Sequence, residues 1–132
     1  MTFYAKHISV SIKRPADEVY KFASNPANLP LWAAGLGGLI KKEDDFWTSD
    51  SPLGEIRIRF ADNNSFGILD HYVTLPSGDI IYNPMRVFTN NDGCEVLFTL
   101  YRLPGMSDKQ YKEDAQFVKK DLIKLKGMLE RS

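Results

Sequence analysis

The chain has little of what disulfide frameworks, zinc sites and membrane spans require. Its 132 residues include one cysteine and two histidines, which excludes an internal disulfide and a zinc cage of cysteine and histidine ligands. Basic and acidic residues number 17 each, so no net charge attracts a polyanion such as a nucleic acid. The longest apolar stretch, residues 31–40, contains three glycines and is too short to span a membrane. We therefore expect a soluble, cytoplasmic protein without metal, organic cofactor or nucleic-acid partner.

The length and composition are those of one ordinary globular domain covering residues 1–132. Apolar residues make up 43% of the chain and charged residues 26%, and no linker or repeat divides it. Residues 7–13 alternate polar and apolar side chains, which predicts a half-buried strand. Pro15 then favours the start of a short helix, and Asn25 can cap a second, very short one.

From Gly35 onward the sequence is typical of strands joined by tight turns. Six segments rich in β-branched and aromatic residues are separated by clusters of Gly, Pro, Asn, Asp and Ser, which predicts an antiparallel meander. The predicted strands lie near residues 38–43, 46–49, 55–61, 66–75, 80–89 and 95–103.

A long C-terminal helix is predicted over Asp108–Arg131. Ser107 and Gln110 form a capping-box pattern at its start. Apolar residues then recur at intervals of three and four, at Tyr111, Ala115, Val118, Leu122, Leu125 and Leu129. The expected fold is α+β, with a curved antiparallel sheet of about seven strands around this helix and two short helices after the first strand. Such a curved sheet favours an internal cavity between sheet and helix.

Several segments have a combined pattern that is informative. They are I-S-V-S-I-K-R-P-A-D-E-V-Y-K-F at 8–22, L-P-L-W at 29–32, D-H-Y-V-T-L-P-S-G at 70–78 and N-P-M-R-V at 83–87 with F-T-L at 98–100. Together they resemble the START-like superfamily, also called SRPBCC, over essentially the whole chain. The last segments look like an uncharacterised bacterial branch related to polyketide cyclases. The resemblance implies a helix-grip fold, and it specifies activity poorly because members act on very different ligands.

Assumed turn lengths assign side chains to the two faces of the sheet. Even-length turns at 62–65 and 76–79 place Ile56 beside His71 and Val73 beside Tyr82. The inward face then comprises Ile56, Ile58, Phe60, Leu69, His71, Val73, Tyr82, Arg86 and Phe88, and the outward face comprises Arg57, Arg59, Asp70 and Asn83. A three-residue loop at 91–93, with Gly93 in the left-handed conformation, turns Val96, Phe98 and Leu100 inward.

His71 and Arg86 are the polar residues of this predicted inward face. They can orient a polar group of a ligand, and His71 can also transfer a proton. Alternatively, His71 bonds a backbone carbonyl or water, and Arg86 forms a structural ion pair with Asp114 or Asp121 of the long helix.

Aromatic side chains complete the candidate ligand-binding set. Trp32 is the stronger aromatic candidate, because the resemblance places the short helices at the cavity mouth, and Tyr82 can donate a hydrogen bond there. Each aromatic residue can equally be ordinary core packing. The predicted ligand-binding residues are Trp32, Phe60, His71, Tyr82, Arg86 and Phe98, with His71 as a candidate for catalysis and no metal ligands.

Three functions compete at this stage. The first is binding of a small, largely hydrophobic molecule of lipid, polyketide or aromatic type in the internal cavity. The second is a cyclase- or dehydratase-like enzyme, implied by the resemblance, in which His71 removes a proton and Arg86 or Tyr82 stabilises the enolate. The third is a protein-interaction module, and a homodimer is left open.

Overall fold

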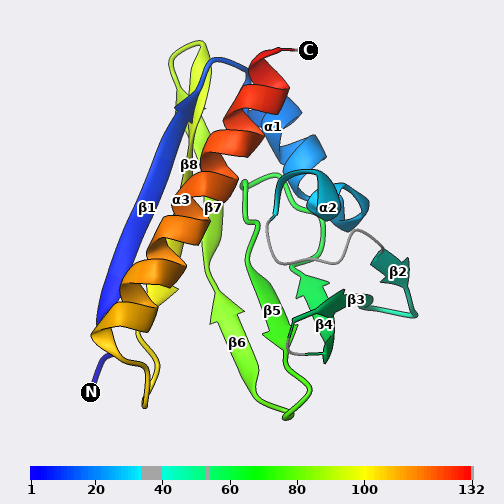
Figure 1. Ribbon diagram of the computed structural model, residues 1–132. Coiled ribbons are helices and arrows are strands. Elements are labelled where there is room, and N and C mark those ends of the chain that lie inside the picture. The colour runs from blue at the N-terminus through cyan, green and yellow to red at the C-terminus, as the bar shows by residue number, and fades with distance from the viewer. Residues whose placement is uncertain (34–39, 53, 132) are drawn as a thin grey trace.

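The computed structural model describes residues 1–33, 40–52 and 54–131 of the chain. These residues form three α-helices, one short 3-10 helix and eight strands (Figure 1). In chain order the elements are β1 (Ala5–Ile12), α1 (Ala16–Ala23), η1 (Pro26–Asn28), α2 (Leu29–Trp32), β2 (Ile40–Lys42), β3 (Trp47–Ser51), β4 (Gly54–Phe60), β5 (His71–Thr74), β6 (Ile80–Asn83), β7 (Met85–Asn90), β8 (Gly93–Tyr101) and α3 (Asp108–Glu130). Residues 38 and 39, the start of the strand predicted at 38–43, lie outside the described residues.

The strands form two antiparallel sheets that α3 helps to cover. One sheet has the order β1-β8-β7 and the other has the order β2-β3-β4-β5-β6. In Figure 1, α3 runs across the first sheet, and β2, β3 and β4 turn away from it on the side of α2. The α+β class and the long C-terminal helix are confirmed, whereas the described residues contain eight strands in two sheets rather than about seven in one.

Pro84 divides the single strand predicted near residues 80–89 into two. Proline has no backbone N–H and cannot donate a bond to a neighbouring strand, so β6 ends at Asn83 and β7 begins in the other sheet. The Pro84 carbonyl accepts a hydrogen bond from the Thr99 N–H of β8 at 3.0 Å. An isolated bridge between Ile68 and Arg86 joins the segment before β5 to β7.

The connection from β4 to β5 is longer than the predicted turn. Phe60, not Ile56, pairs with His71, because the ladder starts only after residues 61–70. Asn64 organises this segment: its Oδ1 accepts from the Phe66 and Ile68 N–H groups at 2.9 and 3.0 Å. The shift in pairing is four residues, an even number, so Phe60 and His71 still share a face as predicted.

The turn between β5 and β6 differs from the prediction by one residue. The Leu75 N–H donates to the Asp79 carbonyl at 2.9 Å, which leaves a three-residue loop whose Gly78 has φ +93°. Val73 therefore pairs with Ile81 rather than Tyr82. A shift of one residue reverses every side chain of a strand, so the predicted inward position of Tyr82 was wrong.

The β7–β8 hairpin also turns over two residues instead of three. Asn90 pairs with Gly93, and the left-handed residue is Asn91 at φ 52° rather than Gly93. Met85 and Val87 are consequently buried, and the predicted inward positions of Arg86 and Phe88 were wrong. Gly93 is needed for another reason, since a Cβ there would lie 2.4 Å from the Ile12 carbonyl oxygen of β1.

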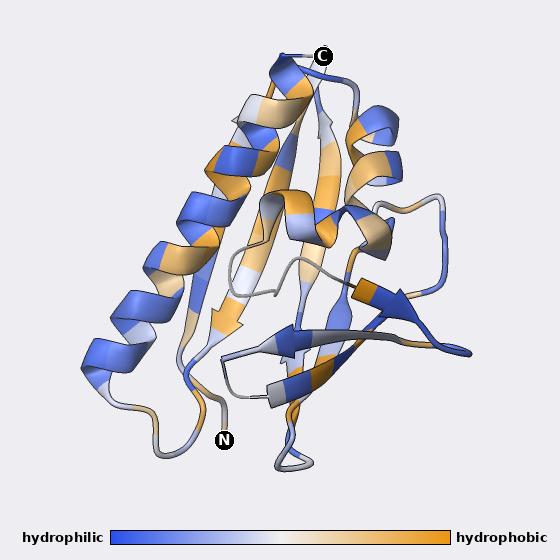
Figure 2. Ribbon diagram, turned by 45° about the vertical axis from the view of Figure 1, so that its right-hand side comes forward, coloured by the Kyte–Doolittle hydropathy of each residue, from blue (hydrophilic) through white to orange (hydrophobic). Residues whose placement is uncertain are grey.

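The helix predictions from capping and periodicity are confirmed. The Ser107 side chain accepts from the Gln110 N–H at 3.1 Å, and α3 covers Asp108–Glu130. The Asn25 side chain accepts from the Ala27 N–H at 3.1 Å and caps η1. Figure 2 shows the hydrophobic residues of α3 on the side that faces the strands and the short helices.

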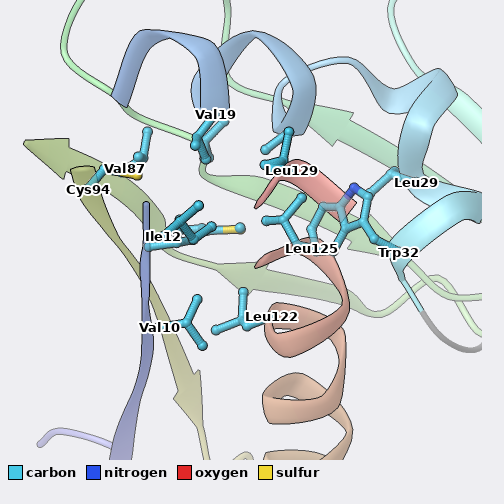
Figure 3. Packing of buried hydrophobic residues seen from close by; sticks show 14 of the residues in the cluster. Val10, Ile12, Val19, Leu29, Trp32, Val87, Cys94, Leu122, Leu125 and Leu129 are labelled. Carbon is cyan, nitrogen blue, oxygen red and sulfur yellow. The ribbon is translucent and has the colours of Figure 1, made fainter. Parts of the chain in front are cut away.

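The core lies between the C-terminal half of α3, the first sheet and the short helices. Figure 3 shows Leu122, Leu125 and Leu129 of α3 among residues of β1, α1 and α2. Cys94 is part of this cluster, and burial raises the pKa of its thiol, so it is a packed side chain rather than an activated nucleophile. The cluster of buried residues comprises Val10, Ile12, Val19, Ala23, Leu29, Trp32, Ile56, Ile58, Leu69, Met85, Val87, Cys94, Val96, Leu122, Leu125 and Leu129.

Candidate functional site

A pocket of about 290 Å³ lies between the sheet and the N-terminal half of α3, and we call it the sheet–helix pocket. Three strands, the β8–α3 connection and α3 contribute to it. Its lining residues are Val73, Ile81, Tyr82, Asn83, Phe98, Leu100, Tyr101, Leu103, Met106, Asp114, Phe117 and Val118. Most of these side chains are aliphatic or aromatic, which suits an apolar ligand.

Local geometry explains why these residues meet. Asp114, Phe117 and Val118 are spaced by three and four residues, so they share one face of α3. On the sheet side, Val73 pairs directly with Ile81, and both side chains lie on the same face of the sheet. The C-terminal half of α3 packs against the core of the protein, and its N-terminal half covers the pocket.

The β8–α3 connection is held in place by Arg102. Its Nε donates to the Met106 carbonyl at 3.1 Å, and its guanidinium pairs with Asp108. The Met106 N–H in turn donates to the Leu103 carbonyl at 3.1 Å. These bonds fix the backbone that presents Leu103 and Met106 to the sheet–helix pocket.

His71 is half-buried and packs against two aromatic rings. Its ring is stacked on Phe60, with centroids 4.8 Å apart, and is tilted against Phe98 at 5.9 Å. Phe98 also lines the sheet–helix pocket, so His71 contacts a residue of the pocket wall but does not line the pocket itself. Of the six predicted site residues, Phe60, His71 and Phe98 thus contact one another, and Phe98 lines the pocket together with Tyr82.

The hydrogen bonding of His71 defines its tautomer. Its Nδ1 lies 3.1 Å from the Leu69 carbonyl oxygen, which only accepts, so Nδ1 carries the hydrogen. Burial lowers the pKa of His71 below its usual value, although the Leu69 carbonyl and the charge of Asp70 act in the opposite direction. The ring is therefore neutral at pH 7, and Nε2 is an acceptor without a partner among the described residues.

Trp32 lies in the core and does not line the sheet–helix pocket. Its side chain is 5% exposed and belongs to the buried cluster shown in Figure 3. Its Nε1 is buried and has no hydrogen-bond partner in the described part of the chain. Packing in the core accounts for the burial of Trp32, and its role in ligand binding stays a prediction.

Arg86 and Tyr82 lie on the outer side of the sheets, where both bind Asp70. The Asp70 carboxylate accepts from the Tyr82 hydroxyl at 2.9 Å, from the Met85 N–H at 2.9 Å and from the Arg86 guanidinium. Arg86 does form an ion pair, but its partner is Asp70, so the expected pairing with Asp114 or Asp121 of the long helix was wrong. The enolate-stabilising role considered for Arg86 and Tyr82 has no geometric basis.

Tyr82 nevertheless reaches the edge of the sheet–helix pocket. Its ring is stacked on Tyr72 at 5.1 Å and lies 6.5 Å from Tyr101 between centroids. Partial burial, followed by the bond to Asp70, raises the pKa of the Tyr82 hydroxyl, which stays neutral. Tyr82 thus offers the pocket an aromatic ring, while its hydroxyl is engaged outside.

Several pocket residues were absent from the predicted set. Tyr101, Leu103 and Met106 follow the last strand in a connection whose path the sequence does not reveal. Asp114 was considered only as an ion-pair partner of Arg86. Its spacing with Phe117 on one face of the helix is the signal that could have placed both in the pocket.

Other hollows on the surface have a different character. One of about 370 Å³ lies between α1, the segment around Asn64 and β7, and the hydrogen bond from the Asn64 N–H to the Tyr20 hydroxyl crosses its wall. In the described residues, no three His, Cys, Asp or Glu side chains gather as a metal site would require. None of the helices there is long and apolar enough to cross a membrane.

Comparison with known proteins identifies the fold. No protein-family model matches the chain, and no curated protein matches it. Among solved structures, a START superfamily protein from Mycobacterium smegmatis matches with a TM-score of 0.68 at 13% identity, covering 96% of this chain and 97% of that one. The chain has the START-like (SRPBCC) fold.

Two further structures extend this START-like likeness. Ara h 8.0201 matches with a TM-score of 0.76 at 9% identity, covering 98% of this chain and 99% of that one. DynU16, a protein of the dynemicin biosynthetic locus, matches with a TM-score of 0.72 at 15% identity, and the match covers 96% of this chain and 47% of that one. At these identities the likeness concerns the START-like fold, so the site must be argued from this chain's own residues.

Proposed function

We propose that this protein binds a small, largely apolar molecule of lipid, polyketide or aromatic type in the sheet–helix pocket. The observation that carries the proposal is the pocket itself: a hollow of about 290 Å³, walled mainly by aliphatic and aromatic side chains of a START-like fold. Ligand pockets in proteins hold roughly 300–1,000 Å³, so the volume favours a small ligand.

Exposed apolar surface around the pocket favours the binding of an apolar ligand. Phe117 is 55% exposed and Tyr82 is 37% exposed, although both line the pocket. Each Å² of apolar surface removed from water by a ligand contributes roughly 25 cal/mol, before the cost of association is subtracted. A ligand that covers these two rings gains from both its own surface and theirs.

A substitution that fills the pocket tests this proposal. Val118→Trp places an indole where the ligand would lie, and we expect it to abolish binding while the protein remains folded. Binding is measured by thermal shift and by NMR chemical-shift changes with a panel of fatty, steroid and aromatic molecules. The matched control is Ile123→Trp, at an exposed position on the same helix, which should bind like the unaltered protein.

The proposal predicts a spatial pattern as well as an affinity. Chemical-shift changes in the unaltered protein should centre on residues 81–83, 98–103 and 114–118. If no molecule of the panel binds, or if Val118→Trp binds as well as the control, the sheet–helix pocket is not the binding site.

A second candidate is a cyclase- or dehydratase-like enzyme, and the state of His71 favours it. A neutral imidazole whose Nδ1–H donates to the Leu69 carbonyl has an acceptor at Nε2 that no described residue occupies, which is the form that a general base requires. His71 also contacts Phe98 of the pocket wall, so its imidazole lies close to the pocket. We rank this function second, because the described residues that line the pocket include no arginine or lysine to stabilise an enolate.

Turnover of a poly-β-keto model substrate separates the two candidates. If His71 is the base, His71→Phe loses at least about a hundredfold in rate, which is the lower end of what general-base catalysis contributes. The control is His7→Ala, since His7 is an exposed residue of β1 whose ring bonds only Thr99 among the described residues. Equal rates in the unaltered protein and in His71→Phe would exclude His71 from any such mechanism.

A further inference from the structure

The sheet–helix pocket is largely apolar, but its lining includes one charged side chain. Asp114 carries a negative charge, and none of the described lining residues is a lysine, an arginine or a histidine. Arg102, the cation of the adjoining connection, is already paired with Asp108 and with the Met106 carbonyl. The pocket therefore has one formal charge, and that charge is negative.

Asp114 is a half-buried residue, and no basic side chain of the described chain pairs with its carboxylate. Its Oδ1 accepts from the Gln110 Nε2 at 2.7 Å, a neutral donor one turn earlier on α3. Within the described chain no basic side chain forms an ion pair with Asp114, and the residue one turn later is Val118. A half-buried carboxylate with a neutral partner attracts a cation more strongly than a fully solvated one does.

Aromatic rings line the same pocket as this carboxylate. Tyr82 and Tyr101 lie 6.5 Å apart between centroids. Phe117 comes from the same face of α3 as Asp114, but the Lys120 Nζ already lies 6.0 Å from the centroid of its ring. Aromatic faces attract organic cations through their quadrupole, and they do so most effectively where water is excluded. A carboxylate with several aromatic rings is a combination suited to an ammonium group.

We propose that the sheet–helix pocket selects apolar molecules that carry an ammonium group. The ammonium pairs with the Asp114 carboxylate beside Tyr82 and Tyr101, and the apolar part lies against Val73, Ile81 and Phe98. This inference rests on the proposed function and adds the ligand's charge to it. Anionic amphiphiles of the same length are disfavoured, because their carboxylate would face that of Asp114 without a counter-ion.

Three eight-carbon probes of equal length test the inference: octylammonium, 1-octanol and octanoate. Dissociation constants are measured by calorimetry and NMR titration at pH 7, below the concentrations at which the probes aggregate. We expect octylammonium to bind roughly tenfold more tightly than 1-octanol and octanoate to bind most weakly. In Asp114→Asn the affinity for octylammonium should fall to that for 1-octanol, whose own affinity should not change.

The matched control is Glu113→Gln. It removes the same charge from the neighbouring residue of α3, which is exposed and lies outside the pocket lining. The preference for octylammonium should persist in this variant, which separates a local contact from the general field of the helix.

Failure of this inference is distinguishable from failure of the proposed function. If 1-octanol and octylammonium bind equally, or if the preference survives in Asp114→Asn, the charge selection is refuted while the apolar pocket stands. If none of the three probes and no molecule of the fatty, steroid and aromatic panel produces chemical-shift changes around the pocket, both proposals are refuted.

Discussion

At the scale of single residues, His71 combines a fixed tautomer with a hydrophobic surrounding. The Leu69 carbonyl holds its Nδ1–H, and the rings of Phe60 and Phe98 remove water from it. Burial is the largest influence on this group and lowers its pKa from 6.5. The folded protein therefore resists protonation of a side chain that the unfolded chain protonates readily.

This difference predicts a pH dependence of stability. Because the folded pKa lies below 6.5, the unfolded chain binds more protons as the pH falls past that value. The contribution of His71 is fully present above pH 6.5 and is lost progressively toward and below the folded pKa. The free energy of unfolding, measured in urea between about pH 7.5 and 5.5, should fall less steeply in His71→Phe than in the unaltered protein.

The control for this slope is His7→Ala, which keeps His71 in place. It should show the slope of the unaltered protein. Glu95 and Glu130, whose pKa values are lowered by hydrogen bonds, lose their contributions only at more acidic pH, below 4.5. Equal slopes for His71→Phe and the unaltered protein would contradict the burial argument.

At the scale of elements, tight backbone approaches decide where the strands lie. Gly67 has φ +72°, and its carbonyl accepts the Val87 N–H of β7 at 2.9 Å. A Cβ at Gly67 would lie 2.0 Å from the Val87 carbonyl oxygen, which is part of a strand and cannot move away. The segment before β5 is thus packed against β7 so closely that only glycine fits.

A pair of alanine substitutions separates conformational strain from this steric contact. Gly105 has φ +83°, and a Cβ there meets nothing within 4 Å, so Gly105→Ala isolates the cost of the left-handed backbone, about 1 kcal/mol. Gly67→Ala should destabilise the protein by a further ~1–3 kcal/mol, because the added methyl overpacks the contact with β7. Equal losses for both variants in urea unfolding would show that β7 is not held so closely.

At the scale of the whole molecule, one carboxylate connects the two sheets. Asp70 precedes β5 of the second sheet and accepts hydrogen bonds from Met85 and Arg86 of β7 in the first. It also accepts from the Tyr82 hydroxyl of β6, next to the break at Pro84. Its side chain is 15% exposed and that of Arg86 is 41% exposed, so the carboxylate has the more buried position.

Substitutions of Asp70 and Arg86 should therefore lower the free energy of unfolding by different amounts. Asp70→Asn removes the charge that three donors share, and we expect a loss of about 1–3 kcal/mol in the free energy of unfolding. Arg86→Met should cost less than about 1 kcal/mol, because its half-exposed guanidinium is screened by solvent. Native-state hydrogen exchange should show faster exchange in β5, β6 and β7 of Asp70→Asn, and an unaltered pattern there would contradict the connecting role.

Local patterns accounted for the helices and for the order of the elements. The Ser107 cap and the apolar spacing of α3 are properties of neighbouring residues, and Pro15 and Asn25 act within one turn of where they stand. These signals need no knowledge of distant contacts. The predicted helix–strand order was therefore correct, apart from the division at Pro84.

The face to which each strand side chain points depended on the lengths of the connecting loops, which local sequence patterns do not determine. One residue fewer in the turns before β6 and β8 reversed Tyr82, Arg86 and Phe88, whereas a shift of four residues left His71 on its predicted face. Arg86 pairs with Asp70, 16 residues earlier in the chain, at the end of the segment that the Asn64 hydrogen bonds organise. Capping and amphipathic periodicity depend on neighbouring residues and can be recognised in the sequence. Pairing register and ion-pair partners are decided only when the sheets close around α3. The alternation of side chains within a strand does not indicate whether the adjoining loop has an odd or an even number of residues.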